Sequence, residues 1–203
     1  IATPGAEPVA EGGYAATLLL DAWASMDRPT LDASEEALRR WLGAAALTRG
    51  ASDGGVTVLC GAPMHTTLAL VEALVRWDPE WFVARELAER VELSLPPTVR
   101  MAQLVGPRVA VQRADELLGL ADSVERLGPL PWAQPHPTGT AGPRATVAGS
   151  APDAAPRIQL LLRAGLDDGP ALMTALTNMK AGPSAHKERD AVGVRVDPTD
   201  GLG

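Results

Sequence analysis

The first residues, IATPGAEPVAEGG, place glycines where a nucleotide-binding protein could bind phosphate. A phosphate loop needs backbone N–H groups that converge on an anion and a lysine that reaches the terminal phosphates. Gly5 and Gly12 are too far apart for that motif, and no Lys-Ser or Lys-Thr pair follows. Glu7 and Glu11 would also repel phosphate. The residues alone therefore favour a flexible connection over a phosphate site.

A pair of carboxylates, Asp167 and Asp168, could in principle share acid–base work. They stand directly before Gly169-Pro170 and an apolar helical pattern, where acidic residues favour the positive end of the helix dipole. No base is near them in the sequence, so we interpret the pair as a helix cap.

Metal and thiol chemistry find little support in the sequence. The histidines are scattered, at His65, His136 and His186. None has a second ligand at metal-binding spacing. The single cysteine, Cys60, permits no internal disulfide and sits in the apolar run VTVLC, where a small buried residue is the simpler interpretation.

The charges are unevenly distributed. The net charge is −7; residues 1–98 carry seven Arg or Lys against fourteen Asp or Glu, whereas residues 99–203 carry eleven of each. Neither half has the basic face of a strong autonomous DNA-binding protein. A loose basic group, Lys180, His186, Lys187 and Arg189, follows the last apolar helix pattern and is more typical of a solvated helix end than of a phosphate clamp. No apolar run reaches the roughly 18–20 residues of a membrane span.

The first half predicts alternating strands and helices. Apolar runs at 16–20 and 56–60 predict buried strands, and a helix that Asp32 can cap separates them. A strand, a helix and a strand of these lengths predict a parallel pair. A further helix covers residues 68–75, and Asp78-Pro79 begins another that ends at LPP.

The second half predicts a different order. Residues 99–105, 124–131, 157–165 and 191–198 are strand-like, and helical patterns follow the first and third of these segments. This order predicts a split βαβ, or ferredoxin-like, antiparallel sheet backed by two helices. Residues 133–156 are rich in Pro, Gly, Ala, Ser and Thr, and we expect a disordered insertion there. The expected domains are residues 1–98, with α/β character, and residues 99–203, with α+β character.

The stretch WDPEWFVARELAERVELSLPP resembles the segment that follows the second helicase lobe of primosomal protein N′, a replication restart helicase family. RLGPLP and VRVDPTDG are similar to later strands of that family. Upstream, IAT resembles helicase motif V, LLLDAW the next strand, and EEALRRWLGAAALTRG the helix leading into motif VI. The resemblance covers nearly the whole chain outside residues 133–156. It implies that the chain begins within motif V, and that an ATP-binding loop and zinc-binding cysteines precede Ile1.

The helicase motifs depart from the pattern of active members. Active motif VI contains a run like Q-x-x-G-R-x-G-R, whose arginines meet the γ-phosphate. The corresponding positions hold Gly43, Ala46, Leu47 and Gly50, and Arg49 is one residue out of register. Motif V likewise has Glu11-Gly12 in place of its Lys-Gly core. The sequence is therefore similar to the branch of the family whose helicase motifs have decayed.

The resemblance implies a cytoplasmic, nucleoid-associated protein that assembles the primosome on branched DNA without ATP hydrolysis. Its expected partners are forked or single-stranded DNA, primosome proteins and single-strand-binding proteins, and no membrane. The DNA-binding candidates in the second half are Arg157, Arg163, Lys180, Lys187 and Arg189. Two alternatives stay open: an ATP-dependent 3′-5′ DNA helicase whose catalytic motifs lie upstream, and an interaction module that never touches nucleic acid. An upstream Gly-x-Gly-Lys-Thr loop and an acidic Mg²⁺ motif would favour the helicase.

Overall fold

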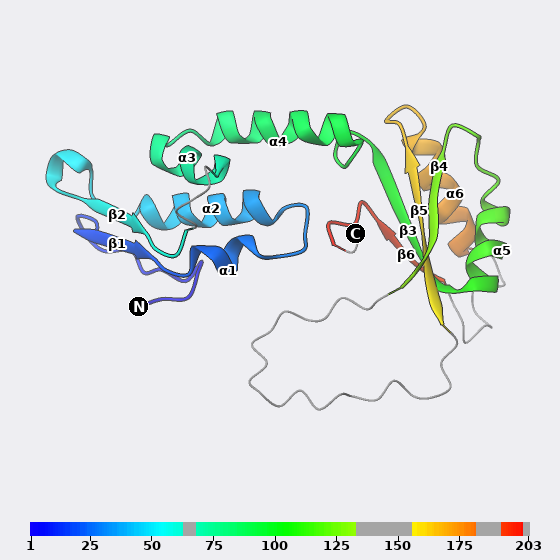
Figure 1. Ribbon diagram of the computed structural model, residues 1–203, viewed down its shortest axis with the longest axis horizontal. Coiled ribbons are helices and arrows are strands. Elements are labelled where there is room, and N and C mark those ends of the chain that lie inside the picture. Colours follow the sequence, from blue (N-terminus) through cyan, green and yellow to red (C-terminus); the bar gives the residue numbers. More distant parts are fainter. Residues whose placement is uncertain (63–67, 133–155, 182–191, 201–203) are drawn as a thin grey trace. The chain divides into compact units, whose positions relative to one another are not determined.

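The computed structural model describes residues 1–62, 68–132, 156–181 and 192–200. These residues form two compact units (Figure 1). Unit 1 contains Ile1–Glu89 together with Thr199 and Asp200, and unit 2 contains Arg90–Pro198. The predicted insertion at 133–156 lies outside the described residues, apart from Pro156.

Unit 1 is built on a parallel pair of strands. The pair is β1 (Ala16–Leu19) and β2 (Val56–Leu59), with Leu18 opposite Val58. The connection between the strands contains α1 (Ala22–Met26), α2 (Ala33–Ala45) and the 3-10 turn η1 (Ala51–Asp53). Two helices follow β2: α3 (Ala69–Arg76) and α4 (Pro79–Leu93). The parallel pairing predicted from the sequence is confirmed; the short helix α1 was not predicted.

The end of this two-stranded sheet packs against a hydrophobic core. Leu19, Trp41 and Phe82 belong to a core cluster contributed by β1, α2, α3 and α4. Burying each such side chain contributes about 1.5–3 kcal/mol. By contrast, Leu18 and Val58 are 61 and 41 % exposed. In β1 the exposed Leu18 and the buried Leu19 therefore face opposite sides, whereas in β2 residues 56–58 are exposed and only Leu59 packs against the cluster.

Of the two helix caps predicted from the sequence, the cap of α4 is present and that of α2 is not. The backbone N–H of Trp81 donates to Asp78 Oδ1 at 3.0 Å, so the predicted cap of α4 is confirmed. Asp32 stands at the cap position of α2, but its side chain makes no cap hydrogen bond. The expectation that it caps α2 is wrong because its backbone (φ −95, ψ 7) is not in the extended region that capping side chains use.

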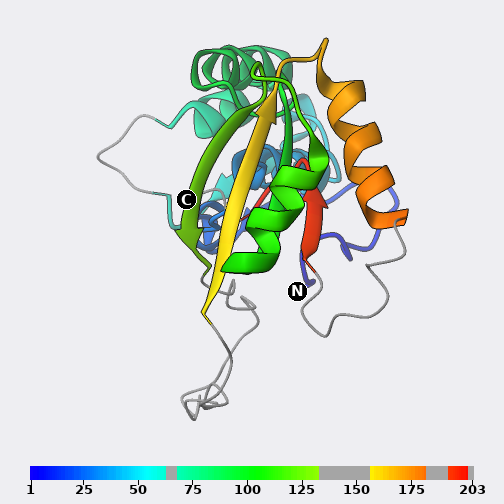
Figure 2. The same ribbon diagram turned by 90° about the vertical axis from the view of Figure 1, so that its right-hand side faces the viewer.

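Unit 2 has the element order β-α-β-β-α-β. Its elements are β3 (Arg100–Pro107), α5 (Arg108–Leu118), β4 (Glu125–Pro131), β5 (Arg157–Ala164), α6 (Gly169–Ala181) and β6 (Gly193–Val196). The strands lie in the order β4-β5-β3-β6, and all neighbours are antiparallel. Figures 1 and 2 show α5 and α6 on the same side of the sheet. This order and these directions are those of the predicted split βαβ.

The core of unit 2 follows from strand alternation. Ala102 and Leu104 of β3 point to the helices, where they join Leu160 and Leu162 of β5 and Leu172 of α6 in one cluster. Leu104, Leu162 and Leu172 are fully buried. The intervening residues face the other side of the sheet, where Gln103 Nε2 donates to Gln159 Oε1 at 2.7 Å. Both central strands are therefore buried along most of their length.

The end of the described chain rejoins unit 1. The backbone N–H of Leu31 donates to the carbonyl oxygen of Thr199 at 2.7 Å, and Thr30 forms an antiparallel bridge with Asp200. Unit 2 is thus inserted between two segments of unit 1, since the chain leaves unit 1 within α4 and returns to it after Pro198. Among the described residues, no helix is long and apolar enough to cross a membrane.

Candidate nucleic-acid interface

The two segments that resemble helicase motifs meet in unit 1. The N–H of Tyr14 donates to the carbonyl of Leu47 at 2.9 Å, and the N–H of Arg49 donates to the carbonyl of Tyr14 at 3.0 Å. Gly13 has a positive φ of 75°, and a Cβ there would lie 3.0 Å from the Arg49 nitrogen. A glycine at this position is therefore needed for the close approach of the two segments.

The polar groups at this junction bond mainly to one another. The guanidinium of Arg49 reaches the carbonyl oxygen of Gly13 at 3.5 Å. The hydroxyls of Thr17 and Thr48 lie 2.6 Å apart, and that of Thr57 is 3.3 Å from Thr48. Leu47 aligns with the first arginine of motif VI in active helicases. It is half-buried and has no group that could donate to phosphate.

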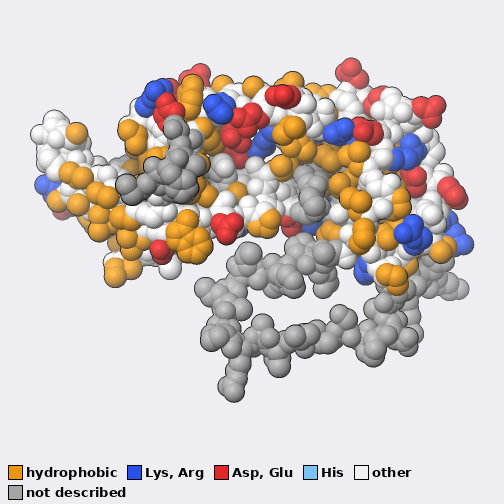
Figure 3. All heavy atoms as spheres, in the orientation of Figure 1, with side chains coloured by type: hydrophobic (Ala, Val, Ile, Leu, Met, Phe, Trp, Pro, Cys, Tyr) orange, Lys and Arg blue, Asp and Glu red, His pale blue; other side chains and the backbone are white. Residues whose placement is uncertain are grey.

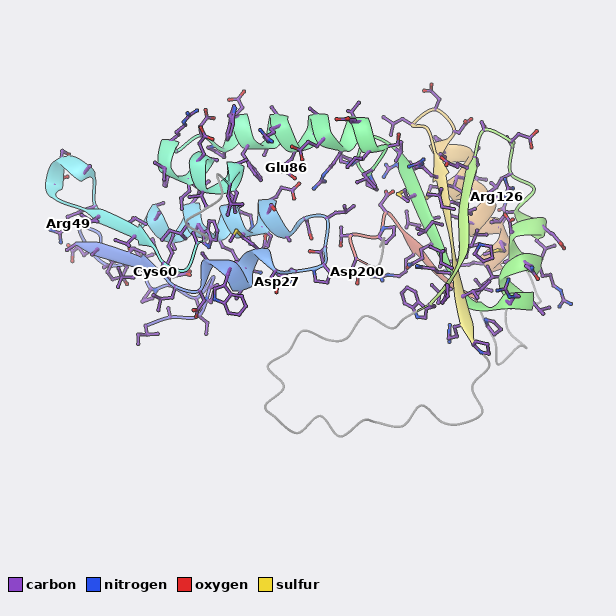
Figure 4. All side chains as sticks on the ribbon, in the orientation of Figure 1. Asp27, Arg49, Cys60, Glu86, Arg126 and Asp200 are labelled. Carbon is purple, nitrogen blue, oxygen red and sulfur yellow. The ribbon has the colours of Figure 1, made fainter. Side chains whose placement is uncertain are left out.

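Three arginines at the end of unit 2 where β3 begins are paired with carboxylates. Arg100 Nη1 lies 2.5 Å from Asp197 Oδ2, whose other oxygen accepts the N–H of Met101 at 2.9 Å. Arg126, which is labelled in Figure 4, donates from Nε to Asp115 Oδ1 at 2.9 Å. We call this part of unit 2 the paired end.

Arg163, a predicted DNA-binding residue, belongs to the paired end. Its Nε and Nη2 donate to Glu125 Oε2 at 2.9 and 2.5 Å. Its Nη1 approaches the carbonyl oxygens of Leu93 and Ser94, each at 3.4 Å. The side chain is only 23 % exposed. Arg163 therefore joins β5 to β4 and to the end of α4, and these bonds use most of its N–H donors.

The opposite end of unit 2 contains cations that are not paired with carboxylates among the described residues. Arg157 begins β5 and is the register partner of Pro107, the last residue of β3; Arg108 is the first residue of α5. The backbone N–H of Trp132 donates to the Arg157 carbonyl at 3.0 Å, so Trp132 continues β4 beside Arg157. Lys180 lies in the last turn of α6, which starts at Gly169 against Arg100 at the paired end. We call Arg108, Trp132, Arg157 and Lys180 the basic end.

The sequence around Arg108 and Arg157 is poor in acidic residues. The sequence has no Asp or Glu between Glu92 and Asp115, nor between Asp153 and Asp167. Arg108, Arg157 and Lys180 are exposed, and within the described residues none of them forms an ion pair. In Figure 3, Lys and Arg side chains gather along the lower right edge of the view, the side on which α5 and β5 begin in Figure 1. As far as the described residues go, these three cations are therefore available to an anionic ligand.

The predicted residues are thus divided by the fold. Arg157 and Lys180 lie at the basic end and Arg163 at the paired end, while Lys187 and Arg189 lie outside the described residues. Sequence reasoning missed Arg108. Its signal is a cation at the first position of a helix, where the dipole disfavours positive charge and a purely structural role gains little.

The other features of the described residues do not indicate a phosphate-binding or metal-binding site. A groove between α5 and α6 is lined by side chains such as Leu117, Pro170 and Met179, and none of its lining residues is charged. Within the described part of the chain, no three His, Cys, Asp or Glu side chains come together as a metal site. Cys60 is half-buried at the end of β2.

These features define the class of the protein. It is an α/β chain of two units, one of which is a split βαβ with a basic end. Residues 91–199, more than half of the chain, match the family described as "Primosomal protein N C-terminal domain". The chain belongs to this family, and the resemblance seen in the sequence is confirmed.

Curated relatives match nearly the whole chain. A "Probable replication restart protein PriA" from Mycobacterium leprae is 40% identical over 200 residues, which are 98% of this chain and 29% of the relative. A protein of the same name from Mycobacterium tuberculosis (strain H37Rv) is 38% identical over 207 residues, covering 98% of this chain and 30% of the relative. The chain therefore spans about three tenths of the length of these relatives.

Proposed function

We propose that these residues are part of a protein that restarts DNA replication by binding branched or single-stranded DNA and assembling the primosome there. Family membership and the names of the relatives support a role in replication restart. The observation that carries DNA binding is the separation of charge in unit 2. Its arginines are paired with carboxylates at one end, whereas at the other end the cations are exposed without ion pairs among the described residues.

Such an interface binds the DNA backbone weakly and without regard to sequence. Each phosphate neutralised by a cation releases counterions, so the log of affinity falls with the log of salt by about 0.7 per phosphate on single strands. The half of the chain with these cations has as many acidic as basic residues, which keeps the overall attraction small. Steep salt dependence is therefore the expected signature.

Fluorescence anisotropy of labelled forked and single-stranded DNA in a salt series tests this proposal. We expect Arg157→Gln and Lys180→Gln each to reduce the slope by about 0.7. Changing Lys187 and Arg189 together to Ala should reduce it by about one to two units. Arg126→Gln removes one charge at the paired end and is the matched control. An unchanged slope in every basic-end variant would show that the cations only solubilise the surface, and unit 2 would be better described as a protein-docking domain.

We further propose that the protein does not hydrolyse ATP. Leu47 and Gly50 stand where active members of the family have arginines, and losing such an arginine typically costs about 10³–10⁵-fold in rate. The full-length protein should show no DNA-stimulated ATPase. Leu47→Arg alone should not restore one, because Gly43 and Glu11 also depart from the motifs. Turnover of several ATP per second on forked DNA would contradict the proposal and favour the helicase alternative.

The remaining expectations concern parts of the protein outside this chain. The family resemblance implies that zinc, and ATP in active members, would bind residues upstream of this chain. Single-strand-binding and primosome proteins are the proposed protein partners, in a cytoplasmic protein associated with the nucleoid. Co-purification of these partners with the full-length protein, and metal analysis of it, test these points.

A further inference from the structure

Trp132 occupies an unusual position for the one aromatic residue that follows Phe82 in the sequence. It is half-buried, so part of the residue stays accessible to solvent. It extends β4 past Pro131 to a position directly opposite Arg157, continuing the pairing of Pro131 with Ile158. Directly opposite residues of an antiparallel pair place their side chains on the same face, with Cβ atoms about 5 Å apart.

That face is the one opposite the helices. Ile158 and Leu160 point into the core beneath α5 and α6, so Arg157 and Gln159 face the other way. Leu130, which pairs with Gln159, is 46 % exposed on that face. The indole of Trp132 and the guanidinium of Arg157 therefore share a surface beside an exposed apolar side chain.

The spacing of the cations suits a nucleic-acid strand that passes this indole. The Cα of Pro107 lies about 5 Å from that of Arg157, and Arg108 is one residue, about 4 Å, further along. In the strand order β4-β5-β3, both arginines lie on the same side of Trp132, Arg157 about one strand spacing away and Arg108 about two. A strand that runs across this end of the sheet from a base at Trp132 can therefore bring successive phosphates to Arg157 and Arg108. In a duplex the bases are stacked on each other, whereas in a single strand every base has a free face for an aromatic side chain.

We propose that the basic end binds single-stranded DNA, with one base stacked on Trp132 and the phosphates that follow on one side of it held by Arg157 and Arg108. This proposal rests on the DNA binding proposed above, but it adds a base contact that phosphate binding does not require. A stacked base tolerates any sequence, because each base has a π face. The site therefore distinguishes single strands from duplexes while it ignores sequence.

The test compares labelled oligo-thymidine with an abasic strand of the same length, using anisotropy and the 203-residue chain. Trp132→Leu should weaken oligo-thymidine binding about 10-fold. The same change should leave abasic-strand binding and the salt slope unchanged. Trp132→Phe should retain most of the affinity, and Arg108→Gln should lower the slope by about 0.7 on both strands. Arg126→Gln is again the matched control.

A crosslinking measurement on the unchanged protein makes the test independent of folding effects in the variants. Oligonucleotides that carry 5-iodouracil should crosslink under ultraviolet light to the peptide that contains Trp132, as located by mass spectrometry. If crosslinks map only elsewhere, or if Trp132→Leu folds and binds both strands as the unchanged protein does, the stacking site is refuted while DNA binding stands. If no strand binds at any salt concentration, the proposed function itself fails.

Discussion

Arg163 should stabilise the fold of unit 2 and contribute little to DNA binding. Its guanidinium donates to Glu125 and to the carbonyl oxygens of Leu93 and Ser94. Two substitutions separate its contributions: Arg163→Met keeps most of the aliphatic stem and removes the polar bonds, whereas Arg163→Ala removes both.

The magnitude follows from the exposure of the partners. Glu125 is 50 % exposed, so the ion pair contributes about 0.5 kcal/mol, in the middle of the range for surface pairs. The two bonds to carbonyl oxygens are 3.4 Å long, beyond the usual range, and together add about 0.5 kcal/mol. The stem adds about 1 kcal/mol, since burial is worth about 0.8 kcal/mol per methylene. We expect Arg163→Met to cost about 1 kcal/mol and Arg163→Ala about 2 kcal/mol.

Urea denaturation followed by circular dichroism measures these changes in the free energy of unfolding. A double-mutant cycle with Glu125→Gln should give a coupling of about 0.5 kcal/mol. Arg108→Ala, at an exposed position of the basic end, is the control and should change stability by less than about 0.5 kcal/mol. If Arg163→Met unfolds at the same urea concentration as the unchanged protein but loses DNA affinity, Arg163 belongs to the interface and our division of unit 2 is wrong.

Three further predictions concern single sites. Leu104→Ala should cost about 3–5 kcal/mol, measured by urea denaturation, because Leu104 is fully buried between the sheet and the helices of unit 2. Gly55→Ala should lower the melting temperature, because a Cβ there would overlap a backbone carbonyl oxygen. Gly43→Ala should raise the melting temperature, because Gly43 lies in helix α2 with open space around it and alanine stabilises a helix by about 0.5–1 kcal/mol relative to glycine. Hydrogen bonds from Arg39 and then Arg40 lower the pKa of Glu36 from 4.5 to about 2. Glu36→Gln should therefore cost about 0.5–1 kcal/mol at pH 7, and urea midpoints should show that difference shrinking as the pH falls from about 4.5 towards 2; a constant difference would refute this pairing.

Local sequence patterns were sufficient to predict most of the helices and strands and to recognise the family. The short apolar runs within 100–107 and 157–164 identify buried strands, and the Asp78-Pro79 pair identifies the start of α4. These signals are short-range because backbone periodicity and capping involve residues within a few positions of one another. The short helix α1 carried no such signal, since five residues are too few to show a periodicity.

The DNA-binding candidates depended on contacts that no local pattern contains. Arg157 and Arg163 lie on the same strand, six positions apart, and as sequence they are equivalent. The structure separates them because β4 pairs with β5 so that Glu125 faces Arg163 and Trp132 follows opposite Arg157. An irregularity between Leu127 and Leu130 shifts the register between these two pairs. Register is set by the packing of whole strands and by the connections that join them, so only the tertiary structure decides which cation is paired and which stays available for a ligand.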